Sequence, residues 1–395
     1  MCLMNMDRRY RVRVTCAPGL SDLLQEEIKS LGLQPVDTDY TGVNLVIPLA
    51  DAMRLNLYLR TAFSVLILLK HFRCPSPKAL YRHAASYAWE ELIPADGYLS
   101  VESHVDNPKI NNTMFANMRL KDAIVDRISE KMGRRPDSGP ARTGVVINLY
   151  WKKDHAYIYL NTSGRKLADR GYRKIPHKAP MQETLAAGVL LRAGCRPGVP
   201  VVNPMCGSGT LAIEAALIVA DRPPGLVRLH FGIEHIIGFD RDTWNSLRAE
   251  ARKKGKGKHN TPIIASDIDP AAVEAARRNA RTAGVEHLIE FHTCDFADTP
   301  VPRMPGIVIL NPEYGKRLGN TDELKNTYKR IGDFFKQKCS HCTGYVFTGS
   351  PELGKCVGLK ASSRSVFFNS GIECRLLRFD MYSGSRETST RSAES

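Results

Sequence analysis

Residues 201–210 read Val-Val-Asn-Pro-Met-Cys-Gly-Ser-Gly-Thr, and this stretch decides the fold of the C-terminal half of the chain. A short apolar run enters a loop with two glycines, and an apolar helix is expected to follow at 209–220. Glycine lets the loop backbone approach a ligand, and the amide end of the helix points toward it. The stretch therefore predicts a strand, a loop and a helix that hold a nucleotide-like cofactor. A Walker loop is excluded because no Gly-Lys-Ser or Gly-Lys-Thr follows.

Strand and helix patterns alternate around this loop. We expect strands at 199–203, 262–266, 288–292, 306–310 and 343–348, and helices at 181–193, 209–220, 270–283 and 322–338. This alternation is typical of a parallel, doubly wound sheet, so the fold class is α/β and the C-terminal domain is Rossmann-like. We expect residues 365–382 to close the sheet as an antiparallel edge hairpin.

A second loop, Asn311-Pro312-Glu313-Tyr314, follows the apolar strand 306–310. The Asn311 side-chain oxygen and the Pro312 carbonyl can accept hydrogen bonds from an amino group, and the Tyr314 ring can stack on a flat molecule. In open parallel sheets, ligands bind beyond the carboxyl ends of the strands, where the strand order reverses. We therefore assign catalysis on a planar amine to Asn311, Pro312 and Tyr314. The plain alternative is a strand-ending turn.

Further cofactor contacts are expected at neighbouring strand ends. Asp267 can bind the ribose hydroxyls, with Asp240 as a rival inside the insertion 221–261. Asp295 can accept the amine of the cofactor's adenine and Phe296 can flank the ring, although Asp295 could instead be an ordinary helix cap. The predicted cofactor set comprises Asn203, Met205, Cys206, Gly207, Ser208, Gly209, Thr210, Asp267, Ile268, Asp295, Phe296 and Asn311.

Two smaller mixed units precede this domain. Residues 8–72 have the β-α-β-β-α-β order of a ferredoxin-like module. Residues 73–162 combine helices at 77–92 and 112–131 with strands at 99–105, 144–150 and 155–160. A basic connector at 163–180 leads to the C-terminal domain at 181–382. Residues 383–395 have the polar composition of a disordered tail.

The charge of the chain indicates a polyanionic partner. Its 395 residues carry a formal net charge of +15, with a pI near 9.4. Such a field attracts nucleic acid and makes binding salt-dependent, although surplus surface lysines would give the same balance. The cations of the connector are expected to contact phosphates. A solvated linker is the alternative.

The cysteines and the hydropathy pattern bound the remaining options. Only Cys339 and Cys342 of the ten cysteines stand close together, and a zinc site needs four spaced ligands. We therefore expect reduced structural thiols and no metal. No apolar run reaches the ~18 residues of a membrane helix. No signal peptide is visible. We expect a cytoplasmic monomer.

Several motifs together resemble the class I S-adenosylmethionine-dependent methyltransferases, specifically the THUMP-containing RNA methyltransferases of the RlmL type. The resemblance runs over residues 8–382, and its carriers are 170–173, 179–187, 203–216, 222–225, Phe231-Gly232 with Trp244, and 311–318. It implies S-adenosylmethionine as the cofactor, a THUMP region that grips structured RNA, and methyl transfer to guanosine N2 of large-subunit ribosomal RNA. In the basic connector, the charges lead us to select Arg165, Lys166, Arg170, Arg173 and Lys174 as RNA contacts.

The chain departs from the family pattern in both loops. Asn203 stands where the family commonly has Asp, so the loop adds no charge near the sulfonium. Glu313 stands in the family's Asn-Pro-Pro-Tyr motif and adds a carboxylate near the base. Transfer RNA, or an adenine or cytosine amine, stays an alternative substrate. A ribosome assembly factor with an inactive domain is a further alternative. A nicotinamide dehydrogenase is disfavoured because hydride transfer has no need for Asn-Pro-x-Tyr.

Overall fold

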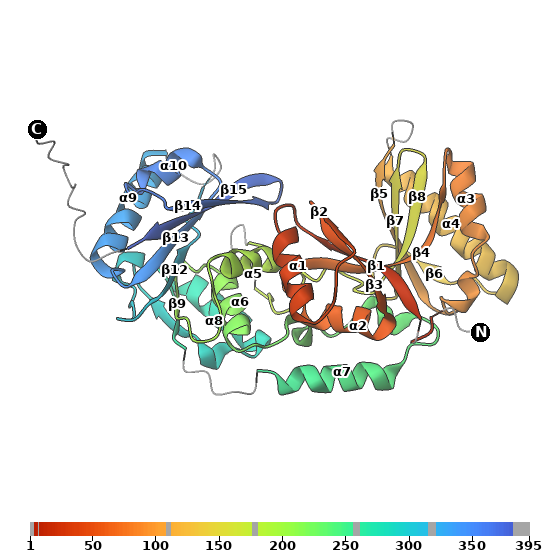
Figure 1. Ribbon diagram of the computed structural model, residues 1–395, viewed down its shortest axis with the longest axis horizontal. Coiled ribbons are helices and arrows are strands. Elements are labelled where there is room, and N and C mark those ends of the chain that lie inside the picture. The colour runs from red at the N-terminus through yellow and green to blue at the C-terminus, as the bar shows by residue number, and fades with distance from the viewer. Residues whose placement is uncertain are drawn as a thin grey trace, which may run out of the picture.

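A computed structural model describes residues 4–6, 8–107, 112–175, 181–255, 261–314 and 321–381. Within these ranges the chain builds two β-sheets that are covered by helices (Figure 1). Several predicted features lie outside the described residues: the whole tail 383–395, the end of the connector at 176–180, and the motif residues 179–180 and 315–318.

The first sheet has the strand order β2-β3-β1-β4-β8-β7-β5-β6. Its strands are β1 (Arg9–Cys16), β2 (Asp37–Asp39), β3 (Gly42–Pro48), β4 (Ala62–Arg73), β5 (Tyr98–Asp106), β6 (Asp137–Ser138), β7 (Val145–Lys152) and β8 (His155–Asn161). Strand β4 pairs with β1 through its first half and with β8 from Leu66 onward. The two predicted N-terminal units therefore share one continuous sheet, and the expected boundary at 72/73 falls inside β4.

Four helices pack on the first sheet: α1 (Ser21–Ser30), α2 (Leu49–Tyr58), α3 (Pro77–Ala85) and α4 (Thr113–Met132). Asn112 caps α4 by accepting the amides of Met114 and Phe115, and the helix ends at Gly133, whose φ of 66° suits glycine. The predicted helix 77–92 ends early, because the buried Trp89 turns back and donates its indole N–H to the Ala84 carbonyl.

The second sheet has the order β11-β10-β9-β12-β13-β15-β14. Its strands are β9 (Val201–Pro204), β10 (Ile263–Asp267), β11 (Glu290–Thr293), β12 (Gly306–Leu310), β13 (Cys342–Thr348), β14 (Ser363–Asn369) and β15 (Ile372–Asp380). The first five in spatial order are parallel, and β15 runs antiparallel to β13 and to β14. The predicted α/β fold class and edge hairpin are confirmed. The order reverses between β9 and β12, the place where such sheets bind ligands.

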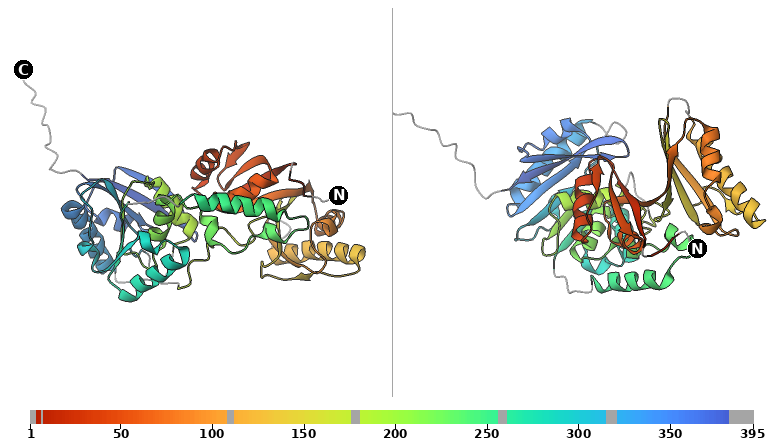
Figure 2. Two further views of the ribbon diagram at one scale, coloured as in Figure 1. Left: turned by 90° about the horizontal axis from the view of Figure 1, so that it is seen from below. Right: turned by 45° about the vertical axis from the view of Figure 1, so that its right-hand side comes forward.

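The helices of the second unit are α5 (Glu183–Arg192), α6 (Thr210–Val219), α7 (Arg241–Lys253), α8 (Pro270–Ala283), α9 (Thr321–Lys338) and α10 (Pro351–Cys356). Helix α7 lies in the insertion 221–261, where no helix was predicted. Asp240 caps it by accepting the Thr243 amide, which gives this rival acid a structural role. Helix α7 packs against α2, so the insertion ties the two sheets together (Figures 1 and 2).

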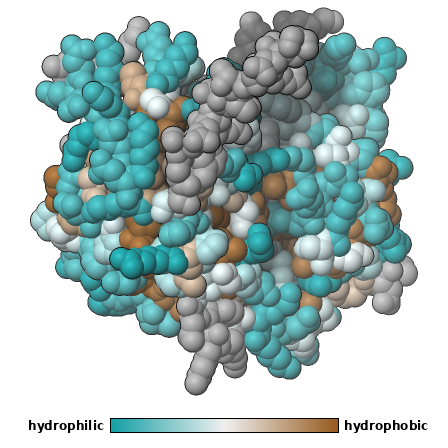
Figure 3. Space-filling view, turned by 60° about the vertical axis from the view of Figure 1, so that its left-hand side comes forward, coloured by the Kyte–Doolittle hydropathy of each residue, from teal (hydrophilic) through white to brown (hydrophobic). Residues whose placement is uncertain are grey.

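The surface reflects the charged composition. Figure 3 brings the end with α9 and α10 forward. That face shows mostly hydrophilic residues, with hydrophobic ones scattered among them. Over the described ranges, no helix is long and apolar enough to cross a membrane. No group of three or more His, Cys, Asp or Glu residues in those ranges is placed to hold a metal ion. The expected lack of a metal stays a prediction.

Candidate active site

The loop between β9 and α6 has an unusual backbone. Met205, Gly207 and Gly209 all have positive φ, at 56°, 54° and 83°. A Cβ on Gly209 would lie 2.8 Å from the Ala276 Cβ, whereas one on Gly207 would meet no atom within 4 Å. Gly209 is therefore needed for packing against α8, and the open side of Gly207 leaves its backbone free to approach a ligand.

Asp267, at the end of β10, holds this loop. Its Oδ2 accepts the Gly207 amide at 2.9 Å and its Oδ1 accepts the Asp269 amide at 3.0 Å. Each carboxylate oxygen has capacity for a further donor. The next residue, Ile268, is 71% exposed, although it is a large apolar side chain beside a polar loop. A carboxylate followed by an uncovered apolar side chain fits a ribose with its attached ring.

Two amide oxygens at the switch point have no partner. Asn203 is 1% exposed and donates from Nδ2 to the Ile309 carbonyl at 2.9 Å. Within the described parts of the chain, no donor reaches the buried Oδ1 of Asn203 or that of Asn311. A buried unmet acceptor costs about 1–3 kcal/mol, so two at one sheet edge indicate that a ligand with N–H groups belongs there. The hydrogen bond to the Ile309 carbonyl also explains why residue 203 is an asparagine, because an ionised aspartate has no N–H group to donate.

Tyr314 is anchored by the edge hairpin. Its hydroxyl accepts a hydrogen bond from Asn369 Nδ2 at 3.0 Å and lies 3.5 Å from Cys374 Sγ. Its ring meets Phe347 edge-on, at 6.3 Å between centroids. A Cβ on Gly349 would lie 2.7 Å from the Tyr314 ring, so glycine leaves the ring its place. Burial raises the pKa of the Tyr314 hydroxyl, which keeps it protonated.

The main chain of the second loop has its own support. The hydroxyl of Tyr328, on α9, lies 2.8 Å from Thr348 Oγ1 and 3.4 Å from the carbonyl of Glu313. The Glu313 side chain is exposed. Sequence reasoning assigned no role to Tyr328 or to Asn369, because nothing local to either residue marks its long-range partner.

Asp295 and Phe296 differ from their predicted roles. Asp295 caps a short 3-10 turn by accepting the Ala297 amide, as the alternative interpretation held, and it also pairs with Arg330 at 2.8 Å. Burial acts to raise the pKa of Asp295, but these two donors outweigh it and hold the pKa below its usual range. Phe296 is 5% exposed and packs edge-on against Phe334. The expectation that its ring lines the cofactor site is corrected: the ring belongs to the core.

The remaining loop residues connect the site to the basic connector. The Cys206 amide donates to the Ser266 carbonyl at 2.9 Å, and burial raises the pKa of its thiol. Thr210 Oγ1 accepts a hydrogen bond from Arg173 at 3.2 Å. Asn279, fully buried on α8, donates to the Ser208 carbonyl and accepts the amides of Lys174 and Ile175. Sequence reasoning missed Asn279, whose signal is a lone amide on an alanine-rich helix face.

Arg170 does not contact solvent. It is 1% exposed, lies 3.4 Å from the buried carboxylate of Glu214, and donates to the carbonyls of Leu167 and Arg60. The hydroxyl of Tyr172 approaches the same carboxylate at 3.2 Å. The predicted RNA contact of Arg170 is therefore wrong. The residue is part of the packed junction between connector and helix α6.

Arg228, from the insertion, shapes the first turn of the connector. Its guanidinium donates to four main-chain carbonyls, those of Ser163, Arg165, Lys166 and Asp169. Burial lowers the pKa of Arg228 to about 10, so the group still carries its charge at neutral pH. With these carbonyls held inward, the side chains of Arg165 and Lys166 stand exposed.

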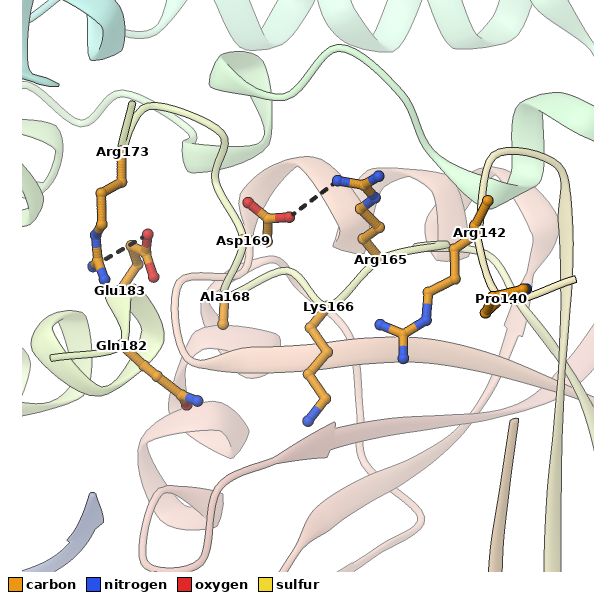
Figure 4. A pocket seen from close by; sticks show the side chains of 10 residues that line it. Pro140, Arg142, Arg165, Lys166, Ala168, Asp169, Arg173, Gln182 and Glu183 are labelled. Carbon is orange, nitrogen blue, oxygen red and sulfur yellow. Dashed lines mark ion pairs between the residues drawn. The ribbon is translucent and has the colours of Figure 1, made fainter. Parts of the chain in front are cut away.

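A cavity of about 620 Å³ lies beside the connector. Its lining includes the cations Arg142, Arg165, Lys166 and Arg173 and the carboxylates Asp169 and Glu183. Arg165 pairs with Asp169 at 3.8 Å and Arg173 with Glu183 at 3.2 Å (Figure 4). Lys166 contacts the Phe63 ring, and no carboxylate in the described ranges pairs with it. Arg173 connects this cavity to the cofactor loop, because it also donates a hydrogen bond to Thr210.

Three family descriptions match the chain. The RlmL ferredoxin-like domain matches residues 12–66, and the THUMP domain matches 75–161. The RMKL-like methyltransferase domain matches 170–378, more than half of the chain. These ranges follow the order of the units predicted from the sequence.

Two relatives of known name agree with these family descriptions. A ribosomal RNA large subunit methyltransferase K/L of Syntrophotalea carbinolica is 38% identical over 95% of our chain and 54% of its own, so the chain spans about half of that relative. A putative RNA methyltransferase of Synechocystis sp. is 33% identical over 93% of our chain and 96% of its own.

A solved structure of a putative methyltransferase complexed with SAH has a TM-score of 0.84 at 26% identity and covers 96% of our chain and 100% of its own. The open Gly207 backbone, Asp267 and the unmet oxygen of Asn203 fit a nucleoside cofactor that bears an amino group, which leaves the unmet oxygen of Asn311 for a second amine. The chain therefore belongs to the RMKL-like methyltransferase family, with a class I S-adenosylmethionine-dependent methyltransferase domain behind its ferredoxin-like and THUMP domains.

Proposed function

We propose that this protein transfers a methyl group to the exocyclic N2 amine of a guanosine in large-subunit ribosomal RNA. The observation that carries the proposal is the buried, unmet Oδ1 of Asn311, which stands in one four-residue loop with Pro312 and the anchored Tyr314. These groups can accept the hydrogens of an amine on a flat base and hold the base in plane.

When bound, S-adenosylmethionine supplies a methyl group that its sulfonium has already activated. The protein has to position the two reactants. In our proposal the main chain of Gly207 and its neighbours contacts the cofactor. The Asp267 carboxylate accepts hydrogen bonds from the ribose hydroxyls, and the Ile268 side chain covers one face of the adenine. The remaining predicted contacts, Asn203, Met205, Cys206, Ser208, Gly209 and Thr210, form the loop around them. Asp295, already paired with Arg330, has one oxygen left for the adenine amine.

The chemistry at the base follows from the lone pair of the amine. This pair is delocalised into the ring, so an exocyclic amine is a poor nucleophile. Hydrogen bonds accepted by Asn311 and by the Pro312 carbonyl favour a pyramidal nitrogen and stabilise the positive charge that develops on it. The protonated hydroxyl of Tyr314 stays bound to Asn369, so Tyr314 orients the ring and takes no proton.

RNA is supported as the substrate by the THUMP domain match and by the printed names of the relatives. The base has to leave its stack, or be unpaired already, to reach the pocket. Lys166 and Arg165 line the cavity beside the connector, where we expect them to contact the RNA backbone. The proposal includes a cytoplasmic monomer without a metal ion.

The test uses the full chain, labelled S-adenosylmethionine and total RNA from a strain that lacks this protein. The RNA is separated by size after the reaction. Label in the large-subunit RNA supports the proposal. Label in transfer RNA would favour that alternative, and cofactor binding without any methyl transfer would favour an assembly factor.

A further inference from the structure

Four rings form one row across the first sheet, and we call them the aromatic row. His104 on β5 stands opposite Tyr150 on β7, which stands opposite Tyr157 on β8, which stands opposite His71 on β4. The ring centroids along the row are 5.7, 6.0 and 4.1 Å apart. The two outer pairs are nearly parallel, at 17° and 12°. Each of four adjacent strands thus contributes one ring to a single stack.

The row lies on the face of the sheet away from α3 and α4. The other face carries the buried side chains Leu149, Trp151 and Ile158. Phe72, next to His71 in sequence, stacks on His83 of α3 and so marks the helix side. Figure 1 shows both helices on one side of β4, β5, β7 and β8. His71 and His104 are exposed, and Tyr150 and Tyr157 are half-buried.

The polar edges of the row have capacity for a ligand. Within the described ranges no hydrogen bond engages the hydroxyl of Tyr150 or Tyr157, and Asn148 Oδ1, two residues before Tyr150 on the same face, is buried without a donor. His71 Nε2 lies 3.2 Å from His155 Nδ1. One end of the row is open, because β6 pairs with β5 only at Tyr98 and Leu99 and does not reach His104.

The flanks of the row carry more positive than negative groups. Lys152 stands opposite His155 in the next row, and Arg11 lies close enough to His71 to lower its pKa, behind burial and His155. Arg73 is neutralised by Asp154 at 3.1 Å. Two carboxylates on β5 share the face of His104: the exposed Asp106, opposite Lys152, and Glu102, which pairs with Arg142.

Cross-strand aromatic pairs can serve the sheet alone. Such pairs need no exposure, no free hydroxyls and no histidine at both ends. Single-stranded RNA, by contrast, is bound by aromatic and imidazole rings that continue its base stack, with basic groups and hydroxyls for its phosphates and 2′-hydroxyls.

We propose that the aromatic row binds an unpaired segment of RNA. A base extends the stack on the open face of His104, and the hydroxyls of Tyr150 and Tyr157 bond to the sugar and phosphate edge. Lys152 lies beside the middle of the row and Arg11 lies near its His71 end, so both can contact the backbone. The inference rests on the proposed function, because its partner is the RNA substrate, and it assigns the RNA contact of the THUMP part to this face of the first sheet and to these four rings.

The test measures the affinity of the full chain for a labelled single-stranded RNA oligonucleotide by fluorescence anisotropy. His104→Ala and Tyr150→Ala should each weaken binding about tenfold, since removing one stacking ring costs roughly that much. Tyr40→Ala is the matched control, because Tyr40 is 59% exposed on the ferredoxin-like part. It should leave the affinity unchanged. His104 sits at the exposed edge, so its variant tests the row even where Tyr150→Ala fails to fold.

Calorimetry with S-adenosylmethionine separates the two proposals. If the row variants keep their affinity for S-adenosylmethionine but lose affinity for RNA, the result supports RNA binding by the aromatic row. This holds whichever base the enzyme methylates. Row variants that bind the oligonucleotide like the parent chain overturn the inference, even where guanosine methylation is found. A loss seen equally with Tyr40→Ala would also overturn it.

Discussion

The edge of the second sheet and the basic connector differ in how many of their polar groups already have partners. At the edge, the side-chain oxygens of Asn203 and Asn311 are buried and unmet. In the connector, Arg170 and Arg173 are paired with carboxylates, and Arg165 lies 3.8 Å from one. In this protein, buried acceptors without a partner indicate a ligand site. The number of basic residues in the connector overestimates the surface that is available to RNA, because several of them already pair with carboxylates.

The largest expected effect is a difference in stability between alanine variants of two connector arginines, Arg170 and Arg165. Arg170→Ala leaves the buried carboxylate of Glu214 without its partner and should lower the free energy of unfolding by about 3–5 kcal/mol. Arg165→Ala removes an exposed side chain and should change it by less than about 0.5 kcal/mol. Urea unfolding of both variants measures the difference. Equal stabilities would mean that Arg170 is not the packed residue described here.

Asn311→Ala tests the sheet edge. Removing the acceptor should lower the single-turnover rate of methyl transfer by about 100-fold or more, the scale seen when one preorganised hydrogen bond to a transition state is lost. Affinity for S-adenosylmethionine, measured by calorimetry, should stay within about twofold of the parent. A variant that keeps most of its single-turnover rate would remove Asn311 from the catalytic set.

Glu183, where the connector meets α5, should give a pH-dependent stability. Burial raises the pKa of Glu183 from its usual 4.5 to about 7, although Arg173 opposes the shift. Between these values the folded state binds the proton more tightly than the unfolded state, so the free energy of unfolding falls as pH rises through that window. The contribution is at most about 1.4 kcal/mol per pH unit. Glu183→Gln should flatten this part of the stability profile. An unchanged slope would contradict the buried, proton-binding role.

The smallest effect concerns Lys166, the cavity cation that pairs with no carboxylate in the described ranges. Lys166→Ala should weaken RNA binding a few-fold and make the salt dependence shallower by about 0.7 to 0.9 in the slope of log affinity against log salt. Lys29, exposed on α1, provides the control variant. Binding curves at several salt concentrations decide the case. Equal slopes for Lys166→Ala and Lys29→Ala would show that the cavity is not an RNA contact.

Elements with strong local signals could be predicted closely. Strand β12 spans Gly306–Leu310 and helix α8 spans Pro270–Ala283, the bounds predicted from hydrophobic patterns. Asp269 caps α8 before its first-turn proline, and Gly284 ends it with a φ of 71°. In such segments the local pattern and the tertiary packing favour the same structure.

Features that depend on distant partners could not be predicted. Asn369 reaches the Tyr314 hydroxyl across 55 positions, and Arg228 reaches the Lys166 carbonyl across 62. The charge of Arg170 suggested an exposed site, but its fate depended on Glu214, a carboxylate inside an otherwise apolar helix. Phe296 was predicted to flank the adenine because it follows the end of a strand. In the fold, Phe334 and Arg330 pack against its ring and bury it. Only the fold brings these pairs together.

The function proposed here depends on the unmet side-chain oxygen of Asn311, which accepts the N2 amine of guanosine. The most direct measurement is mass spectrometry of the nucleosides in RNA that the full chain has methylated. We expect N2-methylguanosine, and its yield should fall in parallel with the rate when Asn311 is replaced by alanine. Finding N6-methyladenosine or N4-methylcytidine instead would contradict it and would direct attention to Glu313, the exposed carboxylate beside the pocket.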